Sequence, residues 1–148
     1  MTRIALYQAR TGIDPEANAR DLVAAAAEAA AGGAAFLFTP EMSGLLDSDR
    51  ARAAERLSFE KDDLVLAAVR EAAATAGIWV HLGSLAVKRK DGRLANRGYV
   101  IDDQGEVRAT YDKLHLFDVD LESGESWRES ALYAPGERTV VAATPAGR

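Results

Sequence analysis

Residues 12–40 read GIDPEANARDLVAAAAEAAAGGAAFLFTP, and this stretch decides the fold class of the chain. Asp14 and Pro15 suit the N-cap and first turn of a helix, and a glycine pair would end that helix. The apolar residues 34–40 that follow are predicted to form a strand ended by proline. Residues 3–10, RIALYQAR, alternate as a buried strand does. A strand, helix and strand in this order predict a parallel pair with a crossover helix and hence an α/β fold.

The following segment continues with helical spacing and then a third strand. A short helix is expected around residues 49–57, and a longer one from an N-cap at Ser58 to Gly77. Residues 78–87, IWVHLGSLAV, are predicted to form a strand buried on both faces. We interpret His81 within this strand as a core histidine.

Hairpin signals then replace helical spacing. The turn residues Asp91-Gly92 and 102–105 bracket a predicted strand at 94–101, and another strand follows at 106–111. The sheet is therefore expected to mix parallel and antiparallel pairs. The remaining sequence predicts a long connection with one helical turn near residues 127–132.

A last strand is predicted at residues 138–144, and PAGR at 145–148 is predicted to be a turn.

Composition limits the classes of function. The chain has 148 residues, of which 48% are hydrophobic and 28% charged, so a single folded domain is expected. The net charge of −5 argues against nucleic-acid and anionic-membrane partners, and the basic run 88–90 is interpreted as a hairpin tip. Without a signal-like or membrane-spanning apolar segment, the expected location is cytoplasmic. Because there is no cysteine, this chain has no disulfide, cysteine-bound metal or cysteine nucleophile.

Two charged residues lie just beyond predicted strands, where ligands collect in open α/β sheets. Glu41 follows FLFTP, and its apolar neighbours would partly remove the carboxylate from water, as suits a general base. It could equally be an acidic residue that opens the next segment. Lys113 follows VRATY within apolar surroundings and could stabilise an oxyanion, with Glu41 and Glu129 as available anionic partners.

An oxygen-rich metal site is the alternative for this region. His115, Asp118, Asp112 and Glu41 could supply ligands, although their spacing is not diagnostic. We favour a structural interpretation in which His115 and Asp118 bind backbone groups and stiffen the loop. No nucleotide-binding glycine motif and no G-x-S-x-G motif is present, so no cofactor is predicted.

Three segments together carry a family resemblance. FTPEM at 38–42, YDKLHLFDVD at 111–120 and WRESALYAPGE at 127–137 are similar to the nitrilase superfamily of carbon-nitrogen hydrolases. The branch resembled is that of omega-amidases and deaminated-glutathione amidases. The resemblance implies a four-layer αββα sandwich with mixed sheets, of which this chain would be the N-terminal half. It also implies a homodimer or higher homo-oligomer and a small linear amide as substrate.

The resemblance further implies a Glu, Lys and Cys triad that hydrolyses amides through a thioester and releases ammonia. Glu41 matches the general base, Lys113 the lysine, and Glu129 a second glutamate beside that lysine. Because the chain has no cysteine, we interpret residues 1–148 as the N-terminal part of one carbon-nitrogen hydrolase domain that ends before the nucleophile. The longer parent is then the enzyme, and the 148 residues alone are expected to be inactive.

Two other hypotheses stay open. One is a metal-dependent phosphoesterase, which also builds four-layer sandwiches. The other is a half-domain without catalytic activity that binds a partner chain. Half a sandwich would leave an apolar sheet face without its covering layer, so the isolated residues 1–148 are expected to be poorly stable or to associate strongly.

Overall fold

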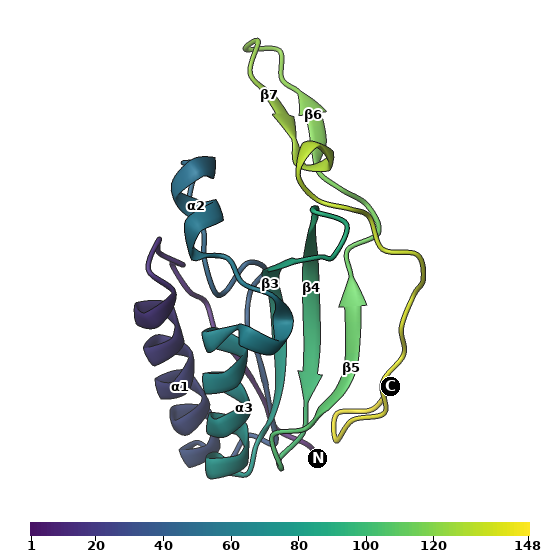
Figure 1. Ribbon diagram of the computed structural model, residues 1–148. Coiled ribbons are helices and arrows are strands. Elements are labelled where there is room, and N and C mark those ends of the chain that lie inside the picture. The colour runs from purple at the N-terminus through teal and green to yellow at the C-terminus, as the bar shows by residue number, and fades with distance from the viewer.

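Strands β1 to β5 form one mixed sheet in that order (Figure 1). The computed structural model describes all of residues 1–148. The strands are β1 (Ile4–Leu6), β2 (Phe36–Phe38), β3 (Trp79–Lys88), β4 (Leu94–Ile101) and β5 (Val107–Asp112). β1, β2 and β3 are parallel neighbours, whereas β4 is antiparallel to both β3 and β5. The predicted α/β class, parallel pair and mixed sheet are confirmed.

The helices are α1 (Pro15–Ala31), α2 (Arg50–Arg56) and α3 (Leu64–Ala76), and the 3-10 turn η1 (Glu60–Asp62) precedes α3. The predicted cap of α1 is confirmed, since the Asp14 side chain accepts a hydrogen bond from the N–H of Glu16. The predicted start of α3 at Ser58 is wrong. Asp63 is the N-cap instead, because its carboxylate can accept from the Leu66 N–H while η1 occupies the intervening residues. No helix is long and apolar enough to cross a membrane.

Helices α1 and α3 pack against each other and cover one face of the sheet (Figure 1). Alternate residues of the central strands point into this layer, as the period of a strand requires. They include Leu37, Val80, Leu82, Tyr99 and Ile101, each at most 2% exposed. The main core therefore lies between the helices and one face of the sheet.

The opposite face of the sheet carries no helix. Ile4 and Leu6 of β1 are 48% and 74% exposed, so the prediction that this strand is buried is wrong for both side chains. Their neighbours on this face are aromatic, with Phe38 packed edge-on against His81 at 5.6 Å between ring centroids. His81 is thus packed but only partly buried. The predicted burial of β3 on both faces is confirmed for residues 84–87 and is wrong for residues 79–83, where only alternate residues are buried.

The long connection after β5 folds into a hairpin that the sequence did not predict. Strands β6 (Asp118–Asp120) and β7 (Ser126–Arg128) pair antiparallel and project away from the main sheet (Figure 1). The expected helical turn is present as η2 (Glu129–Ala131).

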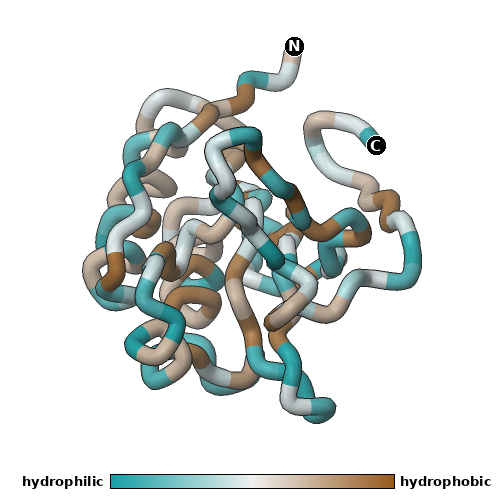
Figure 2. The backbone as a smooth tube through the Cα atoms, turned by 90° about the horizontal axis from the view of Figure 1, so that it is seen from above, coloured by the Kyte–Doolittle hydropathy of each residue, from teal (hydrophilic) through white to brown (hydrophobic).

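The strand predicted at residues 138–144 is wrong. This apolar stretch finds no neighbouring strand and lies at the periphery of the molecule (Figure 2), where Val141 is 76% exposed. The turn predicted after it is confirmed by a hydrogen bond from the Gly147 N–H to the Thr144 carbonyl.

Candidate functional site

Glu41 stands on a tight bend directly after β2. The next residue, Met42, has a positive φ of 55°, and its N–H donates to Ser84 Oγ at 2.9 Å. Gly83 allows the bend to lie against β3, because a Cβ there would be 2.3 Å from the carbonyl oxygen of Thr39. A backbone conformation that costs energy and is held by neighbouring groups is common at functional sites. The bend fixes the backbone of Glu41 at the carboxyl end of β2.

Lys113 follows the last residue of β5 and reaches the same edge of the sheet. Its N–H donates to the backbone carbonyl of Asn96 at 2.9 Å. Its ammonium Nζ lies 2.9 Å from Glu41 Oε1 and 2.9 Å from Glu129 Oε2. The structure thus brings the three predicted site residues together in one hydrogen-bonded cluster.

Glu129 is the most buried of the three side chains, at 15% exposure, compared with 27% for Lys113 and 57% for Glu41. Its Oε2 also accepts from the Phe117 N–H at 2.6 Å, which ties the start of the loop to η2. This backbone contact, rather than burial of Phe117, holds the segment, since Phe117 is 57% exposed.

Asn96 of β4 completes the cluster, although it was not predicted from the sequence. Its Nδ2 donates to Glu41 Oε1 at 2.7 Å and to Glu129 Oε1 at 3.1 Å. Asn96 is buried, with only 4% of its surface exposed. The sequence feature that could have indicated Asn96 is a polar amide within the largely apolar strand LANRGYVI. The hydrogen-bond partners of this amide lie far away in the sequence.

Neighbouring groups shift the pKa values of two residues of the cluster, Lys113 and Glu129. Partial burial alone would lower the pKa of Lys113, but its hydrogen bonds to Glu41 and Glu129 outweigh burial and leave this pKa raised. Burial alone would raise the pKa of Glu129, but donation from Phe117, Lys113 and Asn96 outweighs it and leaves that pKa lowered. Both groups therefore stay charged near neutral pH.

Tyr133 is a further neighbour that was not predicted from the sequence. Burial, followed by the negative charges of Glu129 and Glu41, raises the pKa of Tyr133 to about 12. Its hydroxyl therefore keeps its proton at neutral pH and can donate a hydrogen bond beside the cluster.

A mainly apolar cavity of about 550 Å³ opens onto the cluster. Leu45, Leu46 and Leu57 line it from the segment around α2, and Phe117, Trp127 and Leu132 from the hairpin side. Cavities of this size and character, with a few polar groups at one end, are typical of small-molecule sites. A second space of about 240 Å³ shares Glu41, Asn96 and Lys113 and is otherwise lined by small residues and Tyr111.

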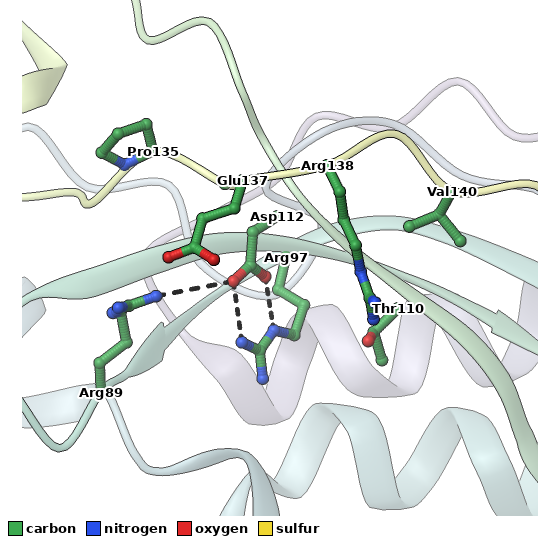
Figure 3. Close-up of a pocket in the computed structure, with 9 residues that line it drawn as sticks. Arg89, Arg97, Thr110, Asp112, Pro135, Glu137, Arg138 and Val140 are labelled. Atoms are coloured by element: carbon green, nitrogen blue, oxygen red, sulfur yellow. Dashed lines mark hydrogen bonds and ion pairs between the residues drawn. The ribbon is translucent and has the colours of Figure 1, made fainter.

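A separate polar cavity of about 350 Å³ lies beside β5 under residues 135–140 (Figure 3). Arg97 binds Asp112 at 2.6 and 2.9 Å, and Arg89 lies 3.8 Å from the same carboxylate (Figure 3). Two of its arginines, Arg89 and Arg97, are thus paired with acidic groups of this chain, whereas Arg138 makes no ion pair. The apolar cavity at Lys113 is therefore the stronger candidate for a substrate site.

The residues considered as metal ligands are not gathered around one point. The Asp118 carboxylate accepts from the N–H and Oγ of Ser130, which confirms its predicted bracing role. His115 is exposed and makes no hydrogen bond, so its predicted bracing role is wrong. No group of three or more His, Asp or Glu side chains is placed to hold a metal ion.

Fold and site together define an α/β protein with a Glu–Lys–Glu cluster at the strand ends of a mixed sheet. The sequence pattern of the family described as "Carbon-nitrogen hydrolase" matches residues 3–148. This chain therefore belongs to the carbon-nitrogen hydrolase family, the nitrilase superfamily.

Curated relatives agree with this assignment. The chain is 35% identical over 119 residues to the deaminated glutathione amidase of Yersinia enterocolitica, which covers 78% of this chain and 41% of the relative. It is 34% identical over 148 residues to the nitrilase and fragile histidine triad fusion protein of Drosophila melanogaster, covering 98% of this chain and 31% of the relative. The chain thus spans about two fifths or less of these relatives.

Solved structures show the same fold over part of their length. The C. elegans NitFhit protein superposes with a TM-score of 0.85 and 26% identity, covering all of this chain and 37% of that one. An amidase from Nesterenkonia sp. superposes with a TM-score of 0.76 and 30% identity, covering 93% and 49%. The α/β architecture with a mixed sheet is therefore the nitrilase fold over part of its extent.

Proposed function

We propose that this chain carries the general base and the oxyanion-stabilising lysine of an amidase that hydrolyses small linear amides. The observation that carries the proposal is the lysine ammonium held 2.9 Å from each of two carboxylates at the end of an apolar cavity. Amidase names among the relatives support this substrate class. Residues 1–148 would then be the N-terminal part of one domain.

The nucleophile must come from residues outside these 148, because they contain no cysteine. One solved structure of a variant of the Nesterenkonia amidase shows acrylamide added at its active-site cysteine, and another is in complex with butyramide. By this analogy, a cysteine supplied beyond residue 148 would face Glu41 and Lys113. The 148 residues alone would lack amidase activity.

The proposed reaction uses each group of the cluster in turn. Glu41 takes the thiol proton as the thiolate sulfur bonds to the amide carbon, and Lys113 stabilises the resulting oxyanion. Glu41 returns the proton to the leaving nitrogen, so ammonia departs and a thioester remains. Glu41 then activates water, which releases the carboxylic acid and regenerates the thiol. Glu129 holds Lys113 in position throughout.

The test is ammonia release from butyramide by the full-length protein and by its Glu41→Gln variant. We expect turnover by the parent protein and a loss on the order of 100-fold or more in the variant, because an amide side chain cannot accept the thiol proton. Turnover unchanged by the substitution, or a full-length protein without cysteine, would overturn the proposal. As part of it we place the protein in the cytoplasm, as a homodimer or larger homo-oligomer.

A half-domain that binds a partner is a second candidate, favoured by the exposed apolar face around Ile4 and Leu6. It predicts a stable complex with a different chain and no effect of Lys113→Ala on any reaction. Size-exclusion chromatography of the full-length protein beside the ammonia assay distinguishes the two candidates.

A further inference from the structure

The side-chain amide of Asn96 touches both carboxylates of the site at once. Its nitrogen lies 2.7 Å from Glu41 Oε1 and 3.1 Å from Glu129 Oε1. Carboxylate oxygens only accept hydrogen bonds, so the amide nitrogen, with its two N–H donors, is the atom that must face them. Both donors of this amide are thereby committed to the cluster.

The backbone of Asn96 contacts the third charged residue of the cluster, Lys113. Its carbonyl accepts the Lys113 N–H at 2.9 Å, so one residue of β4 contacts Glu41, Lys113 and Glu129. The residue itself is buried in the middle of a paired strand. These contacts place Asn96 as the common support of side chains that come from three separate segments.

Because Asn96 is a neutral donor, it binds the two carboxylates without changing the net charge of the cluster. Two carboxylates that approach one ammonium repel each other, and a second cation between them would cancel the remaining negative charge. Asn96 holds both carboxylates without adding charge, so the cluster keeps one net negative charge. A carboxylate that keeps its negative charge can still accept a proton, as the role proposed for Glu41 demands.

We propose that Asn96 is the positioning residue of this site, fixing Glu41 and Glu129 on either side of the Lys113 ammonium through a neutral, two-donor amide. The inference rests on the proposed function for its effect on turnover. Its effect on the ionisation of the cluster is independent of any reaction.

The experiment compares Asn96→Ala and Asn96→Asp in the full-length protein. Alanine removes both donors, and aspartate keeps the shape but replaces the donors with a third carboxylate beside Glu41, Lys113, Glu129 and Tyr133. We expect turnover on butyramide to fall about 10- to 100-fold for alanine, as for other supporting residues, and further for aspartate. The loss should appear mainly in kcat, because the apolar side chains that line the cavity are unchanged.

A second measurement distinguishes a positioning role from a merely structural one. NMR titration gives the pKa values of Glu129 and Lys113, which a merely structural residue would not change. Loss of the Asn96 donor should raise the pKa of Glu129 in both variants. The negative charge added in Asn96→Asp should also raise the pKa of Lys113 above its value in the parent protein. Asn18 provides the matched control. It is also a buried asparagine, 6% exposed, but its amide binds the backbone of Gly12 and Gly44 instead.

Three results separate the possibilities. Shifted titrations with reduced turnover, set against an Asn18→Ala variant that loses stability alone, support the proposal. Unchanged titrations in both Asn96 variants overturn it, whatever the turnover. Shifted titrations in a full-length protein that has no amidase activity support the positioning role and refute the proposed function instead.

Discussion

The ammonium of Lys113 lies 2.9 Å from Oε1 of Glu41, although the two residues are 72 positions apart in the chain. The contact exists because Glu41 follows β2 and Lys113 follows β5, and the carboxyl ends of both strands lie at the same edge of the sheet. Charged groups at that edge are positioned by the sheet rather than by local sequence, as in other open α/β folds.

Lys113→Ala should reduce turnover of the full-length protein by on the order of 100-fold or more, because its ammonium, held by Glu41 and Glu129 at the cavity, is the donor proposed to stabilise the oxyanion. Ammonia release from butyramide measures the effect. Lys61→Ala is the control, since that side chain is 81% exposed and lies outside the cluster. Equal turnover in both variants would contradict the role given to Lys113.

The Glu129–Lys113 pair predicts that its contribution to the free energy of unfolding is constant over a middle range of pH and decreases at both lower and higher pH. The folded-state pKa of Glu129 lies below its ordinary 4.5, so its stabilisation is present above that pH and is lost as the pH falls through the lower, folded-state value. The pKa of Lys113 lies above its ordinary 10.5, so its stabilisation is complete below that pH and is lost as the pH rises through the higher value.

Urea unfolding of the full-length protein across this pH range measures that contribution. Glu129→Gln should flatten the acidic side, because glutamine has no proton to take up there. Glu125→Gln, at an exposed position of the hairpin, should leave the profile unchanged. An acidic limb that persists unaltered in Glu129→Gln would show that other carboxylates set it.

Gly83→Ala should destabilise the protein by about 1–3 kcal/mol and displace Glu41, because overpacking a close backbone contact forces the chain to move. The added Cβ would lie 2.3 Å from the Thr39 carbonyl oxygen. At Gly12 the nearest atom would be 3.5 Å away, so Gly12→Ala is the matched control. Thermal unfolding and the ammonia assay together test the prediction, and a Gly83→Ala protein as stable and active as the control would refute it.

The exposed apolar face predicts that residues 1–148 expressed alone associate as their concentration rises. Leu6→Glu should weaken this association, since that side chain is 74% exposed in β1 on the face without helices. Sedimentation velocity over a range of concentrations measures it. Val23→Glu, a partly exposed position of α1, should leave association unaltered. A monomeric species with a cooperative unfolding transition in the parent chain would contradict the prediction.

Much of the fold was accessible from local chemistry. Asp14 and Pro15 predicted the start of α1, and the turn residues Asp91-Gly92 predicted the hairpin of β3 and β4. These signals work because capping, turn formation and strand alternation depend on residues within a few positions of each other. The strand predicted at 138–144 failed for the complementary reason, since a strand also needs a neighbour to accept its hydrogen bonds.

By itself the sequence determined the α/β class, the family resemblance and the three charged residues Glu41, Lys113 and Glu129. Only the tertiary structure decided that Asn96 joins them and that His115 does not. Hydrogen bonds between remote segments depend on sheet register and backbone direction, which no short stretch of sequence contains. The amide of β4 therefore became visible as part of the site only once the strands were placed side by side.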